Sequence, residues 1–205
     1  MSFDPILEKV GRYYTGRLRE HGTTARGVDW NSEESQNLRF TQLARVLPSV
    51  SYSVVDYGCG YGALVTFLEE RGDEFDYQGF DISPAMVARA VEDHGGSGRR
   101  FVKSQTELEP ADFALASGVF NVKLDTPGDE WTEYVTHTLA VLDRLGRLGF
   151  AFNMLTSYSD ADRMRADLYY ADPCRFFDLC KRSFSKQVAL LHDYGLYEFT
   201  MLVRK

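Results

Sequence analysis

The spacing of hydrophobic residues changes near residue 52 and separates a helical beginning from a segment of alternating strands and helices. From Pro5 to Glu20 apolar side chains recur at helical spacing, so we expect one amphipathic helix there. A polar link that contains glycine follows. Within it Asn31 and Glu34 have the spacing of a capping box, which predicts a second helix that ends before Pro48.

Beyond residue 52, short β-branched runs alternate with longer stretches of helical periodicity. Ser83 followed by Pro84 predicts the start of one helix, and Asp172 followed by Pro173 predicts the start of another. The last two apolar runs flank Gly195 and predict an antiparallel hairpin. The expected strands before this hairpin are residues 53–58, 77–81, 99–104, 111–121 and 148–155, and the expected helices among them are residues 63–72, 83–95 and 129–146.

This alternation predicts an α/β fold with a largely parallel sheet, which the closing hairpin makes mixed. A chain of 205 residues fits one domain better than two, so we interpret residues 1–205 as a single domain. Within it, residues 1–48 are expected to form an N-terminal helical cap and residues 49–205 the α/β core.

Composition and charge restrict the partners and the compartment. The net charge is -7, which disfavours a nucleic-acid partner because phosphate contacts need clustered Lys and Arg. No apolar run is long enough for a membrane span, and the first residues carry acids instead of a signal-peptide core. The three cysteines are an odd number without a CxxC pair, which is typical of a reduced protein. We therefore expect a cytoplasmic protein without membrane contact.

The stretch "VVDYGCGYG" carries the first candidate chemistry, because Gly58, Gly60 and Gly62 follow a predicted strand at alternate positions. Glycines at a strand-to-helix turn allow unusual backbone angles or the close approach of a ligand. Asp81 ends the next strand, where a carboxylate can bind ribose hydroxyls. The alternative interpretations are a tight turn without a ligand for the glycines and a helix cap for Asp81.

The spacing of these glycines distinguishes the turn from two other nucleotide sites. The dinucleotide fingerprint is G-x-G-x-x-G, whereas this chain has G-x-G-x-G with Asp56 just before it. A carboxylate at that position would repel a phosphate but attract a cation. The absence of a GK[ST] sequence excludes a P-loop. The expected ligand therefore has a ribose and a positive charge, and no phosphate near the turn.

Three motifs in this order, "VVDYGCGYG", "GFDIS" and "ASGVFN", resemble those of class I S-adenosylmethionine-dependent methyltransferases. The resemblance extends from Tyr52 to the C-terminus. It implies a Rossmann-like seven-stranded sheet whose last strand is antiparallel. It also implies that the cofactor is S-adenosylmethionine and that the product is S-adenosylhomocysteine.

The resemblance also implies roles for particular residues. Asp56 would lie by the ammonium of the cofactor, Asp81 by the ribose hydroxyls and Ile82 against the adenine. The adenine amino group would be bound by Gln105, with Glu107 as an alternative, because the acidic residue that is common in the family is missing there. The implied cofactor-binding residues are Asp56, Tyr57, Gly58, Cys59, Gly60, Gly62, Asp81, Ile82, Gln105, Ser117 and Gly118.

The residues that would bind the acceptor are less defined by the sequence. We expect the acceptor over residues 117–121, beneath the connection that carries Tyr158, Arg163 and Arg165. This connection is either a lid that binds an anionic acceptor or a solvated loop with ion pairs to nearby aspartates. The candidates for closing over the cofactor are Trp30 and Arg39, and the candidates for a general base are His21 and His192. Packing in the core or on the surface is the alternative for each. No catalytic residue and no metal ligand are assigned.

Taken together, the sequence predicts a methyltransferase that uses S-adenosylmethionine and acts on a small-molecule acceptor. The segment "SGVFN" replaces the D/N-P-P-Y element of base amino-methyltransferases, which disfavours a DNA acceptor. A protein or RNA methyltransferase is the alternative within the family. A binding protein without catalysis and a nicotinamide-dependent oxidoreductase are alternatives from other classes. The acceptor and the oligomeric state are not specified by the sequence.

Overall fold

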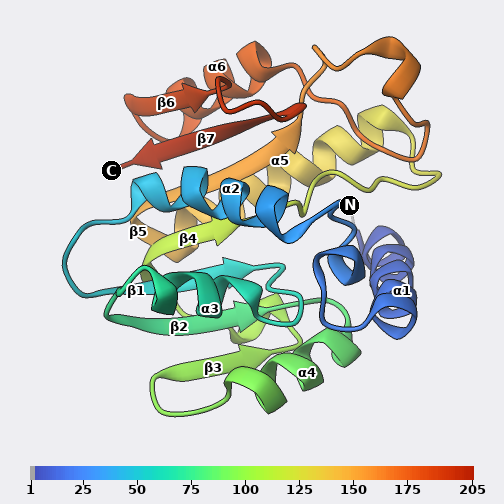
Figure 1. Cartoon of the computed structure of the whole chain (residues 1–205). Coiled ribbons are helices and arrows are strands. Elements are labelled where there is room, and N and C mark those ends of the chain that lie inside the picture. Colours follow the sequence, from blue (N-terminus) through green and yellow to red (C-terminus); the bar gives the residue numbers. More distant parts are fainter. Residues whose placement is uncertain (1–2) are drawn as a thin grey trace.

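The strands form one mixed sheet in the order β3-β2-β1-β4-β5-β7-β6 (Figure 1). The computed structural model describes residues 3–205. β7 runs antiparallel to both of its neighbours, while the pairs among β1 to β5 are parallel, so the predicted seven-stranded sheet is confirmed. The strands of the described residues are β1 Tyr52–Tyr57, β2 Phe75–Phe80, β3 Arg99–Val102, β4 Ala111–Ala116, β5 Gly146–Leu155, β6 Gln187–Leu191 and β7 Glu198–Arg204.

Helices cover both faces of the sheet and one of its ends. In Figure 1, α2 and α3 lie in front of the sheet, α5 and α6 lie behind it, and α1 stands beyond the ends of the central strands. The helices of the described residues are α1 Asp4–His21, α2 Glu33–Leu43, α3 Ala63–Glu70, α4 Pro84–His94, α5 Gly128–Leu145 and α6 Pro173–Ser183. Short 3₁₀ turns add η1 Ala25–Val28, η2 Ala44–Val46, η3 Gln105–Glu107 and η4 Ala161–Arg163.

Side-chain caps start three of these helices. The Ser83 hydroxyl accepts the backbone N–H of Met86 at the start of α4, and Asp172 caps α6 in the same way, as the sequence predicts. The predicted cap of α2 is wrong by one residue. Ser32 has the extended backbone of a cap, and it forms a reciprocal capping box with Ser35, so Asn31 and Glu34 are not the pair involved.

A separate apolar core lies on each face of the sheet. Behind it, α5 buries Trp131, Val135 and Leu139 completely. In front of it, Leu43 of α2 and Leu64 of α3 belong to the same cluster. α2 therefore packs in the layer of α3 on the sheet face, while α1 and η1 extend over the strand ends.

The parallel pairing places the ends of β1 and β4 next to each other at the centre of the sheet. Asp56 of β1 is level with Gly79 of β2 on one side and with Leu115 of β4 on the other. The loops that follow these strands therefore leave the sheet at a common edge, where the strand order reverses. In α/β sheets this is the position at which ligands bind.

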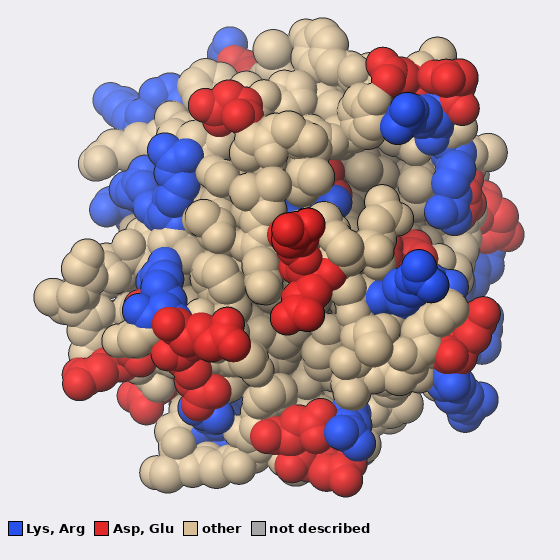
Figure 2. All heavy atoms as spheres, in the orientation of Figure 1, with Lys and Arg blue, Asp and Glu red and all other residues tan. Residues whose placement is uncertain are grey.

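Two further features of the described residues concern the surface of the protein. No helix within residues 3–205 has the length and apolar character needed to cross a bilayer. Figure 2 shows Lys and Arg in small groups, interrupted by Asp, Glu and uncharged residues, over the face that carries α2 and α3. This face therefore offers no broad basic surface for a nucleic acid.

Candidate functional site

A cavity that is open to solvent lies at the carboxyl ends of β1, β2 and β4. Residues of α1, η1 and α2 cover it from the N-terminal side, and the glycine turn after β1 forms its floor. Nine of the residues that the resemblance implicates line this cavity, and they are Asp56, Tyr57, Gly58, Cys59, Gly60, Asp81, Ile82, Ser117 and Gly118.

Two of the implicated residues lie outside the lining. Gly62 precedes α3 with a φ of 91°, and a Cβ added to it would lie 2.6 Å from Cδ2 of His94. It therefore allows α4 to pack against the turn. Gln105 of η3 accepts a hydrogen bond from the hydroxyl of Tyr57 at 2.6 Å. Its contact with the site is through Tyr57, which does line the cavity.

The turn after β1 holds its glycines in left-handed conformations. The φ angles of Gly58 and Gly60 are 84° and 54°, values that side chains with a Cβ rarely adopt. Backbone N–H groups of Gly58 and Cys59 donate to the carbonyl of Phe80 at 2.7 and 2.9 Å, so the turn is tied to the end of β2. A Cβ on Gly60 would lie 3.0 Å from Val28, which shows how closely η1 approaches the turn.

Asp81 connects the turn to the next helix. Its carboxylate accepts the backbone N–H of Gly60 at 2.9 Å and the backbone N–H of Ser83 at 2.8 Å. Burial raises the pKa of Asp81 to about 6, although these two N–H groups act in the opposite direction. The sequence left open whether Asp81 caps a helix or binds a ligand. The structure shows the N–H contact at the helix start and also places the residue in the cavity lining.

Asp56 is a second buried carboxyl group of the cavity. The hydroxyl of Tyr77 donates to its Oδ2 at 2.6 Å, and only 3% of the residue is exposed. Burial, together with the nearby charge of Asp81, raises the pKa of Asp56 to about 7, although the hydrogen bond from Tyr77 acts in the opposite direction. A cation brought next to Asp56 would stabilise the ionised carboxylate. The position therefore suits a positively charged ligand.

The loop after β4 contributes an unsatisfied polar group. The hydroxyl of Ser117 is buried and has no hydrogen-bond partner among residues 3–205. The next residue, Gly118, donates its backbone N–H to the side-chain oxygen of Asn153 at 2.8 Å. Buried hydroxyls in proteins usually have a partner, so the free hydroxyl of Ser117 at the cavity wall indicates a place for a polar ligand group.

Trp30 and Arg39, the two candidates for closing over the cofactor, have different positions. Trp30 lines the cavity, and a Cβ on Gly118 would lie 2.3 Å from its ring, so the indole contacts the loop after β4. Arg39 does not line the cavity. Its guanidinium pairs with Glu198, with 2.9 Å between Nε and Oε2. The structure therefore satisfies the charge of Arg39 within the protein.

Other lining residues were not singled out as site residues from the sequence. They come from the elements that cover the cavity and from α5, and they include Leu7, Val10, Tyr14, Val28, Phe40 and Tyr134. Leu7, Val10 and Tyr14 belong to the predicted apolar face of the first helix. That face would have indicated their burial, but nothing local shows that the helix lies over the strand ends.

None of the four histidines within residues 3–205 lines the cavity. His192, one candidate base, lies with its ring 5.9 Å from that of Tyr158, and His21, the other, lies 3.5 Å from Glu20. His94 packs against Gly62, and burial lowers its pKa. The structure therefore places both candidate bases away from the site.

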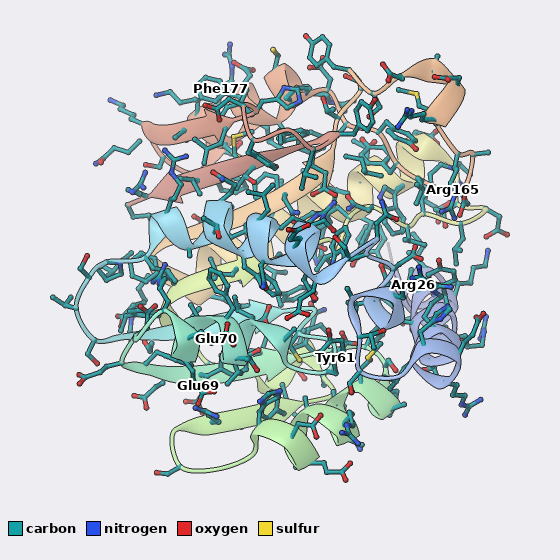
Figure 3. All side chains as sticks on the ribbon, viewed as in Figure 1. Arg26, Tyr61, Glu69, Glu70, Arg165 and Phe177 are labelled. Carbon is teal, nitrogen blue, oxygen red and sulfur yellow. The ribbon has the colours of Figure 1, made fainter. Side chains whose placement is uncertain are left out.

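The residues of the proposed lid also lie outside the lining. Tyr158 is exposed, Arg163 lies 4.0 Å from Asp160, and Arg165 forms an ion pair with Asp167. Figure 3 shows Arg165 on the connection between β5 and α6, and Tyr61 at the start of α3. The observed ion pairs match the alternative of a solvated loop.

Comparisons with known proteins agree with this geometry. Residues 54–146 match the model of a methyltransferase domain family. The chain is 55% identical over 155 residues to Rv1506c of Mycobacterium tuberculosis, which is named as a candidate methyltransferase, and the match covers 75% of this chain and 93% of that protein. The chain therefore belongs to the class I S-adenosylmethionine-dependent methyltransferases. Membership confirms the resemblance seen in the sequence and the expected cofactor, S-adenosylmethionine.

Solved structures show the same fold at low sequence identity. Magnesium protoporphyrin IX methyltransferase from Synechocystis, solved with S-adenosylhomocysteine, superposes with a TM-score of 0.67 at 17% identity, and the match covers 97% of this chain and 99% of that one. Human N-acetylserotonin methyltransferase gives a TM-score of 0.66 at 15% identity, over 100% of this chain and 60% of that one.

Proposed function

We propose that the protein transfers a methyl group from S-adenosylmethionine to a small-molecule acceptor that binds in the cavity at the strand ends. The observation that carries this proposal is the joint lining of one cavity by the glycine turn, by both buried carboxyl groups and by aromatic residues of the covering segments. A covered cavity suits a small acceptor better than the surface of a macromolecule. The similar folds named above are those of enzymes whose names state small-molecule acceptors.

The residues of the cavity fit the donor. Gly60 offers a backbone without a side chain, Asp81 offers a carboxylate at the strand end, and Asp56 can balance a positive charge. The hydroxyl of Ser117, which no group of residues 3–205 binds, can accept or donate a hydrogen bond. The donor supplies a methyl group that is already activated by its sulfonium. The residues of the chain then have to bind the donor and the acceptor, orient them and exclude water from the site.

The covering segments supply the apolar side of the cavity. Trp30 lies against Gly118, and Tyr14 and Tyr134 face the same space from α1 and α5. Burial raises the pKa of both tyrosines, so their hydroxyl groups remain protonated and can act as hydrogen-bond donors. Alignment of two reactants in such a site can lower a barrier by about 7–11 kcal/mol. We therefore assign the rate enhancement mainly to positioning.

Calorimetric titration with S-adenosylhomocysteine, S-adenosylmethionine and NAD tests the donor site. We expect the two adenosyl ligands to bind. In a separate thermal unfolding experiment they should raise the unfolding temperature, because they bind only the folded state. Binding of NAD alone would contradict the proposal.

Transfer of a labelled methyl group tests the class of acceptor. The protein is incubated with labelled S-adenosylmethionine and with separated small-molecule, protein and RNA fractions of a cell extract. We expect the label in the small-molecule fraction. Incorporation into protein or RNA would support the alternative acceptors, while the donor site would stand.

A further inference from the structure

Trp30, Arg39 and the distant Glu198 form a continuous chain of contacts that begins at one wall of the cavity. The ring of Trp30 contacts Gly118 on one side, as shown by the 2.3 Å that would separate it from a Cβ there. On the indole lies the guanidinium of Arg39, with Cζ 3.9 Å from the ring centroid. Arg39 in turn pairs with Glu198 at the start of β7. This chain of contacts therefore runs from the cavity wall to the sheet.

Glu198 also holds the other side of this wall. Its Oε2 accepts the side-chain N–H of Asn153 at 2.6 Å, and the side-chain oxygen of Asn153 accepts the backbone N–H of Gly118 at 2.8 Å. Asn121, in the same loop as Gly118, donates to Oε1 at 3.4 Å. The carboxylate of Glu198 therefore has two connections to the cavity wall. Arg39 links it to Trp30, and Asn153 links it to the loop after β4.

The burial of this network makes its parts depend on one another. Glu198 is 1% exposed, Asn153 is fully buried and Arg39 is 7% exposed. Removing one partner of a buried ion pair leaves the other charge without compensation and without water. Arg39 would then have to move toward solvent, and the ring of Trp30, which is only half-buried, would lose the group that holds it against Gly118.

We propose that Glu198 is a positioning residue of the binding site, which holds Trp30 through Arg39 and the Gly118 loop through Asn153. It does not line the cavity, so it acts only through these neighbours. The binding part of this proposal rests on the proposed donor site. The position of Trp30 can be measured without any ligand.

Fluorine NMR of protein labelled with fluorotryptophan separates the two roles that Glu198 can have. The chain has two tryptophans, Trp30 at the cavity and Trp131 in the core of the rear face, and Trp30→Phe assigns the signals. In Glu198→Gln we expect the Trp30 signal to shift toward its position in unfolded protein while the Trp131 signal stays. An unchanged Trp30 signal in folded Glu198→Gln would overturn the proposal.

A second variant covers the case in which Glu198→Gln does not fold. The double variant Arg39→Met with Glu198→Gln removes both charges, so no buried charge is left unpaired, and it keeps an acceptor for Asn153. We expect it to fold and still to release Trp30. If this double variant keeps the native Trp30 signal, the proposal is wrong.

Binding of S-adenosylhomocysteine provides the second measurement. We expect the Kd to rise by about tenfold in Glu198→Gln, because small displacements of a positioned site have large effects. The matched control is Asp112→Asn, which breaks the 2.9 Å ion pair with Arg147 at the opposite end of β4 and lowers stability without touching the cavity. An equal Kd in Glu198→Gln and the wild type would overturn the proposal. If the wild type binds no S-adenosylhomocysteine, the proposed donor site is wrong. The Trp30 signal would still show whether Glu198 positions this ring.

Discussion

The carboxylate of Asp81 accepts the backbone N–H of Gly60 at 2.9 Å, so the end of β2 sets the position of the glycine turn after β1. The second oxygen accepts the N–H of Ser83 at the start of α4. A single side chain thus aligns the two neighbouring strand ends that line the cavity. Its replacement should alter the ligand site more than the fold.

Asp81→Asn should weaken binding of S-adenosylhomocysteine by about tenfold to a hundredfold, because hydrogen bonds to a charged group contribute about 1.5–3 kcal/mol. In addition, the side-chain NH₂ of the asparagine would face the backbone N–H of either Gly60 or Ser83, and two donors cannot form a hydrogen bond with each other. Calorimetric titration measures the change. Asp76→Asn, at an exposed position of the same strand, is the control and should leave the Kd unchanged. Equal affinities in the two variants would contradict the role assigned to Asp81.

Gly118→Ala should displace Trp30 and weaken ligand binding. The φ of Gly118 is 72°, and the added Cβ would lie 2.3 Å from the indole. Gly195→Ala is a matched control, since its φ is 73° and its Cβ would meet no atom of the described part of the chain within 4 Å. Each substitution strains the backbone by about 1–2 kcal/mol. Chemical denaturation should show this loss in both, and only Gly118→Ala should also raise the Kd for S-adenosylhomocysteine.

The stability of the ligand-free protein should depend on pH through its two buried carboxyl groups. Burial raises the pKa of Asp56 to about 7 and that of Asp81 to about 6, from an ordinary value of 3.8. Because both values are raised, the contribution to stability is complete below about pH 4 and is lost as the pH rises toward 7.

Asp56→Asn tests this dependence, since the amide is neutral at every pH and can still accept the hydroxyl of Tyr77. One titrating group changes the free energy of unfolding by at most about 1.4 kcal/mol per pH unit. Urea denaturation across the window from about pH 4 to about pH 8 should show a smaller loss of stability in Asp56→Asn than in the wild type. Parallel curves would contradict the raised pKa of Asp56.

Arg163→Ala and Arg165→Ala should leave the Kd for S-adenosylhomocysteine within about twofold of the wild-type value, because exposed ion pairs contribute little. Both arginines lie near aspartates of their own connection, and neither lines the cavity. The same titrations check this. A loss of affinity in either variant would contradict this prediction and would support a lid at the connection between β5 and α6.

The sequence predicts best the features that depend on neighbouring residues. Val54 and Val55 form a buried strand, the glycines make the turn after it, and Ser83 caps the helix after β2, all from local spacing. The carboxylate of Asp81 was expected at the site because the end of a parallel strand has a defined place in the fold. The predicted cap of α2 failed by one residue because Asn31 and Ser32 are both suitable caps and only the backbone conformation selects between them.

The contacts that complete the cavity could not be predicted, because their partners are far apart in the sequence. Arg39 and Glu198 are separated by 159 residues, and no local pattern pairs them. The contact of Trp30 with Gly118 depends equally on where α2 packs and on the conformation of the loop after β4. Such contacts depend on how whole helices and strands pack. The sequence could therefore indicate Trp30 and Arg39 as candidate residues, but it could not predict their partners.

The late position of Glu198 has a consequence for the order in which the molecule can assemble during synthesis. Residues 30–39 leave the ribosome long before their anchor on β7, and the strands β1 to β5 can pair before it is made. The ion pair that fixes Arg39 can therefore form only after the hairpin that contains β7 has inserted beside β5. The wall of the cavity around Trp30 is then among the last parts to form, and nascent chains that stop short of Glu198 should carry the five parallel strands without the ion pair that holds Arg39 on Trp30.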